Sequence, residues 1–397
     1  MHFWRKFKER TRKKMKRAKS KKILISFIAF VLLAGILLSS LSLLLINVVN
    51  AEMYTSGLAG CLLETSSGRV LFSKNKDKKL PMASTTKIMT AITAIENCND
   101  LDEKFEISPK AVGIEGTSLY LRKGDVFSTR DLLYALMLIS GNDASVAIAE
   151  HVGGSTSEFV TMMNDLAKKI GALNTHFANT HGLDADGHYT TAYDLALITA
   201  YALENETFKE IVSTKNIKIT NGEGENRYLK NKNKLLFRLD GCIGVKTGFT
   251  NDAGRCLVSA IERDGVRFVC VVLNCGPMFE ESETLLNTCA NTYKLYDLTE
   301  LYDYKKLLPV YDGRKDNVKI GTNESFIYPL SEWKKNNLKI EYNLVDHVDA
   351  PLKKGSEVGE IKIFLGKDLL FSEKVYTIEE VKPKTIFQRF KEFAGNW

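Results

Sequence analysis

A serine and a lysine lie one helical turn apart in the segment PMASTTKIMTAITAIENC, residues 81–98, and together they could perform nucleophilic catalysis. Pro81 ends the preceding element, and apolar residues recur at helical spacing from Ile88 onward. We therefore expect a helix that has Ser84 as its N-cap or in its first turn. A serine hydroxyl is a weak nucleophile until a base accepts its proton, and residues three positions apart lie side by side on a helix. Lys87 therefore predicts an activated serine.

Two further motifs carry polar side chains in settings that expose them. Ser140-Gly141-Asn142 falls at a break between two helical patterns, where glycine permits backbone geometry that other residues cannot reach. Lys246-Thr247-Gly248 falls in a strand pattern, where a glycine leaves the sheet edge open to a ligand. Each motif alone is weak. Their order, their spacings of about 55 and about 105 residues, and their helix, loop and strand settings make a specific combination.

This combination resembles that of the penicillin-recognising serine acyl transferases, which include penicillin-binding proteins and serine β-lactamases. Within that group the chain is most similar to the D-alanyl-D-alanine carboxypeptidases, the low-molecular-mass penicillin-binding proteins, over about residues 52–380. The segments HGLDADGHYTTAYDLA, VKTGFTNDAGRCLV and DAPLKKGSEVGEIKIFL are similar to segments typical of these enzymes. The resemblance implies an α/β (α+β) fold: a transpeptidase domain, with helices packed on an antiparallel sheet, followed by a small all-β sandwich domain.

The resemblance implies catalytic roles for three side chains. Ser84 would be the nucleophile, and Lys87 would accept its proton. An amine that is buried beside a second cation, Lys246, loses its preference for the charged form near neutral pH. Ser140 would relay a proton to the leaving group, and the backbone N–H groups of Ser84 and Phe249 would form the oxyanion hole.

The resemblance also implies a set of substrate-binding residues. Asn142 would bind the substrate amide, Lys246 and Thr247 would hold the terminal carboxylate, and Gly248 would leave room at the strand edge. Members of the family often carry an arginine ahead of the last helix of this domain, near that carboxylate. Here the segment NCGPMFEESE has Met278 and acidic residues instead, which lowers the expected affinity for the carboxylate.

The activity implied by the resemblance is that of a serine-type D-Ala-D-Ala carboxypeptidase, which removes the terminal D-alanine from peptidoglycan stem peptides through an acyl-enzyme at Ser84. β-Lactam antibiotics would acylate the same serine as inhibitors, and no cofactor would be needed. One alternative is a penicillin-binding wall sensor with little turnover, which a weakened site would fit. Another is a serine β-lactamase, but Gly141 stands where those enzymes typically have aspartate, and the chain has no Glu-rich loop segment of the kind that activates a deacylating water.

The N-terminal segment has the pattern of a membrane-targeting sequence. Residues 1–22 carry twelve Lys/Arg and one Glu, a charge of +11 that leaves −4 of the total of +7 for the rest of the chain, so nucleic acid is not an expected partner. Residues 23–51 are uncharged and apolar, and at about 1.5 Å per residue they could cross a bilayer core of about 30 Å. The basic flank predicts a cytoplasmic N-terminus and exported domains. The apolar run is either a signal peptide cleaved after Ala51 or a retained anchor.

The seven cysteines give no sign of a metal site. Their number is odd, several lie in apolar runs such as RFVCVVLNC, and the chain contains no CxxC or HExxH sequence. We interpret the cysteines mostly as small buried hydrophobic residues and expect no bound metal. We interpret His181, His188 and Asp194 as loop and helix-cap residues.

Hydrophobic patterns place the three motifs in one domain, residues 52–297. Apolar runs around Ser66-Ser67-Gly68 and around Asp264-Gly265 predict two hairpins, and helical patterns fill the region between them, with a capping box expected from Ser128 to Asp131. One antiparallel sheet built from both ends of the domain is expected, with a closing helix over residues 281–298.

The remainder of the chain predicts a second, smaller domain and a tail. Residues 305–378 alternate between apolar and polar types, which predicts a small all-β module. In residues 384–397 the apolar side chains fall on one face of a helix that is too short to span a bilayer, so we expect it in the membrane interface. Packing against the β-module is the alternative. The expected location is the outer face of the cytoplasmic membrane, on the cell-wall side.

Overall fold

The computed structural model describes residues 53–298, 307–322 and 324–395. The predicted basic segment 1–22 and the apolar segment 23–51 lie outside these residues. Among the helices that the model does describe, none is both long and apolar enough to span a membrane.

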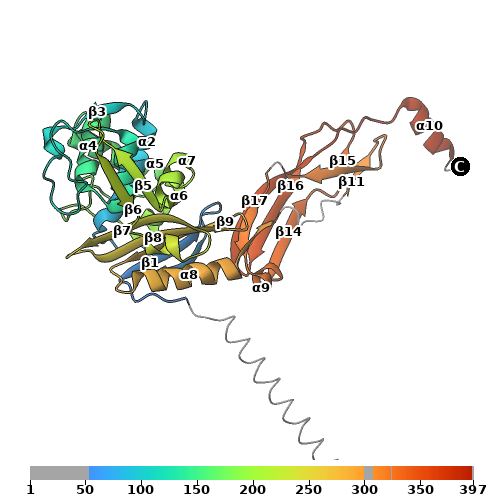
Figure 1. Cartoon of the computed structure of the whole chain (residues 1–397). Coiled ribbons are helices and arrows are strands. Elements are labelled where there is room, and N and C mark those ends of the chain that lie inside the picture. Colours follow the sequence, from blue (N-terminus) through green and yellow to red (C-terminus); the bar gives the residue numbers. More distant parts are fainter. Residues whose placement is uncertain (1–52, 299–306, 323, 396–397) are drawn as a thin grey trace, which may run out of the picture. The chain divides into compact units, whose positions relative to one another are not determined.

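A five-stranded antiparallel sheet forms the centre of the first domain (Figure 1). Its strands are β1 (Ala59–Glu64), β2 (Val70–Lys74), β7 (Cys242–Thr250), β8 (Gly254–Arg263) and β9 (Val266–Leu273). The spatial order is β2-β1-β9-β8-β7, so the two ends of the domain pair through β1 and β9, and β7 lies at an edge. Both predicted hairpins are confirmed, since β1 pairs with β2 and β8 pairs with β9.

Helices cover both faces of this sheet (Figure 1). On one face lies α8 (Met278–Thr292), and on the other lie helices from the region between β2 and β7. Val258 and Val271 belong to the core shared with those helices, whereas the alternate residues Leu257 and Val272 point to the opposite face. The α-helices of this region are α2 (Lys87–Asn97), α3 (Thr129–Tyr134), α4 (Asn142–Gly153), α5 (Thr156–Ile170), α6 (Ala192–Ala202) and α7 (Glu206–Ser213).

Short turns and two small hairpins complete this domain. The turns are the 3-10 turns η1 (Ala83–Thr86), η2 (Pro109–Ala111) and η4 (Lys234–Phe237) and the π-turn η3 (Ala135–Ile139). The hairpins are formed by β3 (Lys104–Glu106) with β4 (Val126–Ser128) and by β5 (Asn216–Thr220) with β6 (Asn226–Lys230).

Local sequence signals start the helices where they were expected. The Ser128 hydroxyl accepts the Asp131 N–H and the Asp131 carboxylate accepts the Ser128 N–H, so the predicted capping box is confirmed. Thr191 caps α6 by accepting the N–H of Asp194, whose carboxylate accepts hydrogen bonds from the preceding loop. This arrangement agrees with the interpretation of Asp194 as a helix-cap residue.

The second domain is all-β. A six-stranded sheet has the order β14-β16-β17-β12-β11-β15, and a separate pair joins β10 to β13. Alternating residues of β16, such as Ile361 and Ile363, lie in the core of this domain. The elements are β10 (Lys294–Asp297), β11 (Leu307–Tyr311), β12 (Asn317–Gly321), β13 (Ile327–Leu330), α9 (Glu332–Lys335), β14 (Leu338–Leu344), β15 (Val348–Asp349), β16 (Glu357–Leu365) and β17 (Asp368–Thr377).

The predicted closing helix over residues 281–298 is too long. α8 ends at Thr292, Tyr293 adopts an extended conformation, and the next four residues form β10. β10 pairs antiparallel with β13, which supplies hydrogen bonds for its backbone. That partner lies more than thirty residues further along the chain, so a local hydrophobic pattern could not reveal it.

The predicted C-terminal helix is present as α10 (Ile386–Gly395), and its apolar side chains lie open to solvent. Ile386 is 87% exposed, Phe387 79%, Phe390 69% and Phe393 68%. Arg389 forms an ion pair with Asp312 of the β-module, so polar contacts attach the helix while its phenyl rings remain uncovered. Packing of these rings against the module, the alternative for this tail, is not observed among the described residues.

Five of the seven cysteines are buried, in agreement with their interpretation as small hydrophobic residues: Cys61, Cys256, Cys270, Cys275 and Cys289. Burial raises the pKa of Cys256 to about 11 and that of Cys61 to about 12, which keeps these thiols protonated and unreactive.

Candidate active site

Ser84 lies inside the turn η1, immediately before α2. The turn begins at Ala83, and its N-cap residue, Met82, makes no side-chain cap. Ser84 is therefore in the first turn, as one of the two predictions had it, and the N-cap alternative is wrong. Ala83 has a φ of +48°, a left-handed conformation that costs free energy for a residue with a Cβ. The strained turn leaves the Ser84 hydroxyl available to a side chain on α2.

That side chain is Lys87, which is fully buried. Its Nζ donates to Ser84 Oγ at 3.0 Å, to Asn142 Oδ1 at 2.7 Å and to the carbonyl oxygen of His181 at 2.5 Å. Burial lowers the pKa of Lys87 well below its usual range, and the nearby charges of Lys246 and Lys232 lower it further. A neutral amine held against a serine hydroxyl can take the hydroxyl proton across the same contact.

The predicted break at Ser140 is a turn in the left-handed conformation, with a φ of +69° after the π-turn η3. Ser140 Oγ is buried and has no hydrogen-bond partner in the described part of the chain, which leaves it able to bond a group that enters the site. Asn142 lies next to Lys87. Besides accepting from Lys87, its side chain donates through Nδ2 to the Glu115 carbonyl at 2.6 Å, so two contacts fix the orientation of the amide.

Lys246, Thr247 and Gly248 lie on the edge strand β7, which packs against η1. Lys246 is 1% exposed, and its Nζ donates to the Thr247 carbonyl at 2.9 Å. Burial and the charge of Lys232 lower the pKa of Lys246 to about 7. A Cβ on Gly248 would lie 3.1 Å from the Ser84 nitrogen, so glycine allows the strand to approach Ser84 closely. The next residue, Phe249, is 63% exposed at the strand edge.

The loop after α5 packs against the turn that carries Ser84 from the other side. Gly182 has a φ of +90°, and a Cβ there would lie 2.0 Å from the Ala83 carbonyl oxygen, so no other residue fits this loop against η1. His181 offers its carbonyl to Lys87. The ring of His188 bonds Thr86 through Nε2 and accepts the Ala178 N–H through Nδ1, which agrees with its interpretation as a loop residue.

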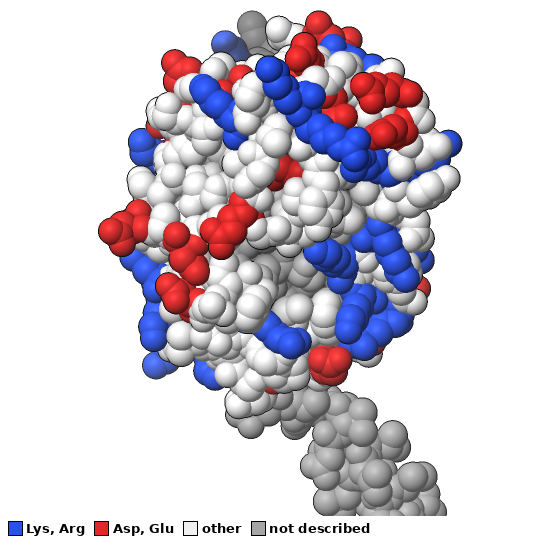
Figure 2. All heavy atoms as spheres, turned by 60° about the vertical axis from the view of Figure 1, so that its left-hand side comes forward, with Lys and Arg blue, Asp and Glu red and all other residues white. Residues whose placement is uncertain are grey.

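These elements enclose a cavity of about 460 Å³ that opens at the surface. Figure 2 shows a hollow on this face of the molecule with Lys and Arg side chains gathered along one side. The sequence-predicted residues Ser84, Ser140, Thr247, Gly248 and Phe249 line the cavity, and Lys87 and Asn142 lie behind Ser84. The remaining lining residues are Thr117, Lys232, Lys234, Arg255, Met278 and Phe279.

Sequence reasoning missed most of these additional lining residues. The alternation of lysine and asparagine in YLKNKNKLL was a possible signal for Lys232 and Lys234, since no buried strand carries so many charges. Arg255 lies within the segment VKTGFTNDAGRCLV, but nothing in the sequence placed it opposite Phe249 at the cavity. Lys232 matters for the chemistry because its charge lowers the pKa of both buried lysines.

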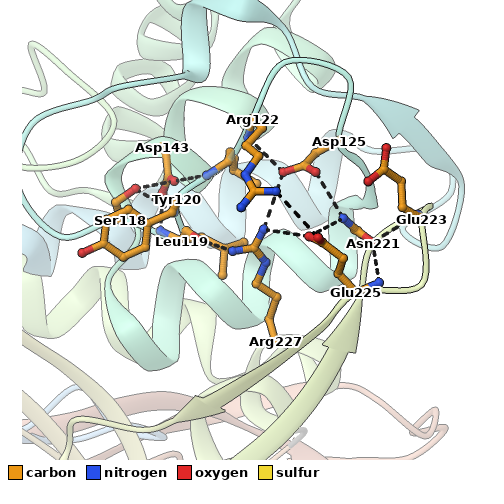
Figure 3. Close-up of polar contacts among 11 residues, drawn as sticks. Ser118, Leu119, Tyr120, Arg122, Asp125, Asp143, Asn221, Glu223, Glu225 and Arg227 are labelled. Atoms are coloured by element: carbon orange, nitrogen blue, oxygen red, sulfur yellow. Dashed lines mark hydrogen bonds and ion pairs between the residues drawn. The ribbon is translucent and has the colours of Figure 1, made fainter.

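A polar network holds the loop that forms another part of the cavity wall (Figure 3). The buried Asp143 carboxylate accepts the Ser118 hydroxyl at 2.6 Å and the backbone N–H of Leu119 at 2.8 Å. Arg227 donates to the Leu119 carbonyl at 3.1 Å and pairs with carboxylates of neighbouring segments. Because Asp143 follows Asn142 directly, one helix start fixes both the amide beside Lys87 and the loop that carries Thr117.

Two protein-family models match this chain, one on each domain. Residues 49–276 match the family described as D-alanyl-D-alanine carboxypeptidase. Residues 293–383 match a domain described as the C-terminal domain of penicillin-binding protein 5. The first match covers more than half of the chain and includes all three motifs.

Similar curated proteins and solved structures extend over both domains. The chain is 29% identical to the D-alanyl-D-alanine carboxypeptidase DacF of Bacillus subtilis, with 87% of this chain and 91% of that protein covered. It is 32% identical to DacC of Escherichia coli, with 85% and 90% covered. The structure of penicillin-binding protein 5 from Haemophilus influenzae is similar with a TM-score of 0.69 and 27% identity, and covers 83% of this chain and 98% of that one.

The electrostatics of Lys87 predict the pH dependence of the reaction at Ser84. The rate of acylation by a β-lactam should rise with pH as Lys87 loses its proton. The midpoint of this rise in the pH–rate profile should lie well below pH 10.5. In Lys232→Gln one neighbouring positive charge is lost, so the pKa of Lys87 rises and the midpoint of the pH–rate profile moves to higher pH. Stopped-flow acylation rates from about pH 5 to about pH 10 measure this shift. Lys168→Gln, which removes an exposed lysine paired with Asp165, is the control. An unchanged midpoint in Lys232→Gln would contradict the effect of the Lys232 charge on the pKa of Lys87.

Gly182 and Gly187 allow a matched test of the support behind the nucleophile. Both have positive φ angles, +90° and +76°, but only at Gly182 would a Cβ collide with backbone; at Gly187 its nearest neighbour is the His176 ring at 3.7 Å. Gly182→Ala should slow acylation of Ser84 at least about 100-fold, while Gly187→Ala stays within about threefold of wild type. Penicillin-labelling rates measure both effects. If the two substitutions slowed labelling equally, the loss would come from strain in the loop backbone and not from the collision with Ala83.

Proposed function

The chain belongs to the D-alanyl-D-alanine carboxypeptidase family, and we propose that it removes the terminal D-alanine of peptidoglycan stem peptides through an acyl-enzyme at Ser84. The observation that carries the assignment of residues is the fully buried Lys87 amine, whose Nζ lies 3.0 Å from Ser84 Oγ. A lysine enclosed in this way has no role in solubility or in a surface ion pair. Proton transfer from the adjacent hydroxyl accounts for its position.

The first step forms the acyl-enzyme. Ser84 Oγ attacks the carbonyl carbon of the penultimate D-alanine while Lys87 Nζ takes the hydroxyl proton. The backbone N–H groups of Ser84 and Phe249 stabilise the oxyanion. The C–N bond then breaks as the proton held by Lys87 passes through the Ser140 hydroxyl to the leaving nitrogen. Its buried hydroxyl, which has no partner within the described residues, supports this role.

The second step releases the shortened peptide. Water adds to the ester carbonyl while Lys87 Nζ takes one of its protons, the bond to Ser84 Oγ breaks, and the serine oxygen takes that proton from Lys87. We assign the substrate amide to Asn142 and the terminal carboxylate to Lys246 and Thr247. Thr247 lines the cavity, whereas Asn142 and Lys246 are buried behind it, and Gly248 leaves the edge of β7 open to an extended peptide. The scheme needs no cofactor or metal, and β-lactams inhibit by acylating the same hydroxyl.

The two alternative functions have less support. Neither the serine β-lactamase nor the penicillin-binding sensor corresponds to the family that matches the catalytic domain, because that family and its curated relatives are described as carboxypeptidases. The sensor would require a site that acylates without turnover. Direct measurement of D-alanine release distinguishes it from the enzyme.

We place the enzyme on the cell-wall side of the cytoplasmic membrane, with its peptidase domain over residues 52–297 and its β-domain over residues 305–378. The exposed phenyl rings of α10, on a helix attached to the β-module by polar contacts, support a tail in residues 384–397 that lies in the membrane interface. Such a tail is most useful if the apolar N-terminal segment is removed after Ala51, so we propose a mature chain that begins at Glu52.

The Ser84–Lys87 pair gives the first test of this function. Full-length wild-type protein in detergent should release D-alanine from a pentapeptide that ends in D-Ala-D-Ala, and a fluorescent penicillin should label the tryptic peptide that contains Ser84. Lys87→Ala should slow labelling much more than tenfold, or by over about 1.4 kcal/mol in barrier, because the proton acceptor is lost. Lys168→Ala, on an exposed helix surface, should match wild type. Labelling at another residue would disprove the nucleophile assignment.

The membrane tail is tested in the bacterial host. Phe390→Ser/Phe393→Ser, or deletion of residues 384–397, should lower the membrane-bound fraction of the processed protein at least about tenfold, because each buried phenyl ring contributes about 1.5–3 kcal/mol. Tyr228→Ser, at an aromatic side chain that is 79% exposed on β6, is the control and should stay bound. Mass spectrometry of the N-terminus reports the processing. A chain that still begins at Met1, or a processed, tail-deleted chain that remains on the membrane, would contradict the proposal.

A further inference from the structure

We infer that Arg255 binds the terminal carboxylate of the substrate together with Thr247, and so takes the place of the arginine that this family often carries ahead of α8. The inference rests on the proposed carboxypeptidase function, and it names the residue that selects peptides with a free carboxyl terminus. It also changes the sequence-based expectation of weak carboxylate binding, which considered only the segment around Met278.

The register of the β7–β8 hairpin brings Arg255 to the substrate strand. Thr247 lies opposite Leu257, and Phe249 lies opposite Arg255. Opposite residues of an antiparallel pair project to the same face of a sheet, and so do residues two apart on one strand. Thr247, Phe249 and Arg255 therefore share one face, and all three line the cavity that contains Ser84.

Arg255 is exposed and lines this cavity, and no ion pair joins it to a carboxylate among the described residues. Other arginines of the same domain are neutralised locally: Arg238 pairs with Glu283, and Arg267 pairs with Glu204. The cavity lining contains three cationic side chains and no Asp or Glu. A cationic cavity without a resident anion favours an anionic group of the ligand.

Of the three cations, Arg255 is the one suited to grip a carboxylate. A guanidinium presents two parallel N–H donors to the two carboxylate oxygens, which an ammonium group cannot do. Lys234 Nζ lies over the Phe279 ring, 5.5 Å from its centroid, so its charge already has a partner. The charge of Lys232 acts on the two buried lysines, Lys87 and Lys246, whose pKa values it lowers.

The start of α8 completes the subsite with apolar surface. Met278 and Phe279 line the cavity and are each 8% exposed. They offer no charge to a carboxylate, but they exclude water from one side, which strengthens the attraction between an anion and a nearby guanidinium. The cation is thus supplied by β8, and the helix that often follows the family arginine supplies the wall.

A pair of peptides isolates this interaction. The first ends in D-Ala-D-Ala with a free carboxylate, and the second is the same peptide with a C-terminal amide. With full-length protein in detergent, kcat/KM is measured for release of D-alanine from the first and of D-alaninamide from the second. Arg255→Gln should lower kcat/KM for the carboxylate peptide about 30-fold or more and leave the amide peptide within about threefold of wild type. The ratio of kcat/KM for the carboxylate peptide to kcat/KM for the amide peptide measures this preference. Arg255→Lys should lower that ratio about fivefold, since the charge stays but the paired donors are lost.

Lys234→Gln is the matched control, since it removes one positive charge from the same cavity. Its ratio should stay within about threefold of wild type. The inference would be overturned if Arg255→Gln kept the wild-type ratio of kcat/KM for the carboxylate peptide to that for the amide peptide. It would also be overturned if Lys234→Gln lowered this ratio as much as Arg255→Gln does. Thermal melting checks that each variant is folded, and if Arg255→Gln is not, an unchanged ratio in Arg255→Lys overturns it equally. Failure of the proposed function is a separate result, because wild-type protein would then release no D-alanine and would not be labelled at Ser84.

Discussion

The structure of this site depends on one costly interaction, an amine buried beside a second buried amine. Lys87 and Lys246 are 0% and 1% exposed, and two protonated amines in such surroundings would repel each other with little solvent to screen them. Burial lowers the pKa of each amine below its usual range, and the charge of Lys246 lowers the pKa of Lys87 further. A deprotonated Lys87 is the form that can activate Ser84. In the proposed mechanism, the free energy that burial costs is thus what favours the reactive, deprotonated form of Lys87.

Keeping that arrangement requires elements that come from distant parts of the chain. Lys87 is on α2, its partner Asn142 begins α4, the His181 carbonyl comes from the loop after α5, and Lys246 is on β7. None of these elements could hold the amine alone, because Asn142 and His181 each accept one hydrogen bond from it and Lys246 acts on it only through its charge. The antiparallel sheet, which pairs β1 with β9 across the domain, is what places them together. Strained or tightly packed backbone at Ala83, Ser140 and Gly182 is tolerated because the surrounding core determines it.

Much of this could be predicted from sequence wherever the cause is local. The capping box at Ser128, the turn at Asp264-Gly265 and the break at Ser140 each depend on a few adjacent residues, and all appear as expected. The end of α8 was not predicted, because residues 294–297 form a strand through pairing with β13 and not through a local hydrophobic pattern. The three motifs together indicated the groups that we propose to react, because their order, spacings and settings form a specific combination although each motif alone is weak. Arg255 and Lys232 escaped notice because surface cations are common, and only register and folding show which of them face a cavity.

A difference follows between the groups that react and the groups that select. Lys87, Asn142 and Lys246 are enclosed by packed core, so a change at any of them leaves a buried polar partner unsatisfied. Arg255 lies at the exposed start of β8, where a side chain reaches the cavity without being part of its packing. A guanidinium from the start of α8 or from β8 could bind a carboxylate at the edge of the cavity, because the attraction requires only charge and two aligned donors. Proton transfer at Ser84 allows no such choice of position, since it requires one amine at one hydrogen-bonded distance. The proposed reacting pair is therefore fixed by the fold, while the cation proposed to bind the peptide end can come from a different strand.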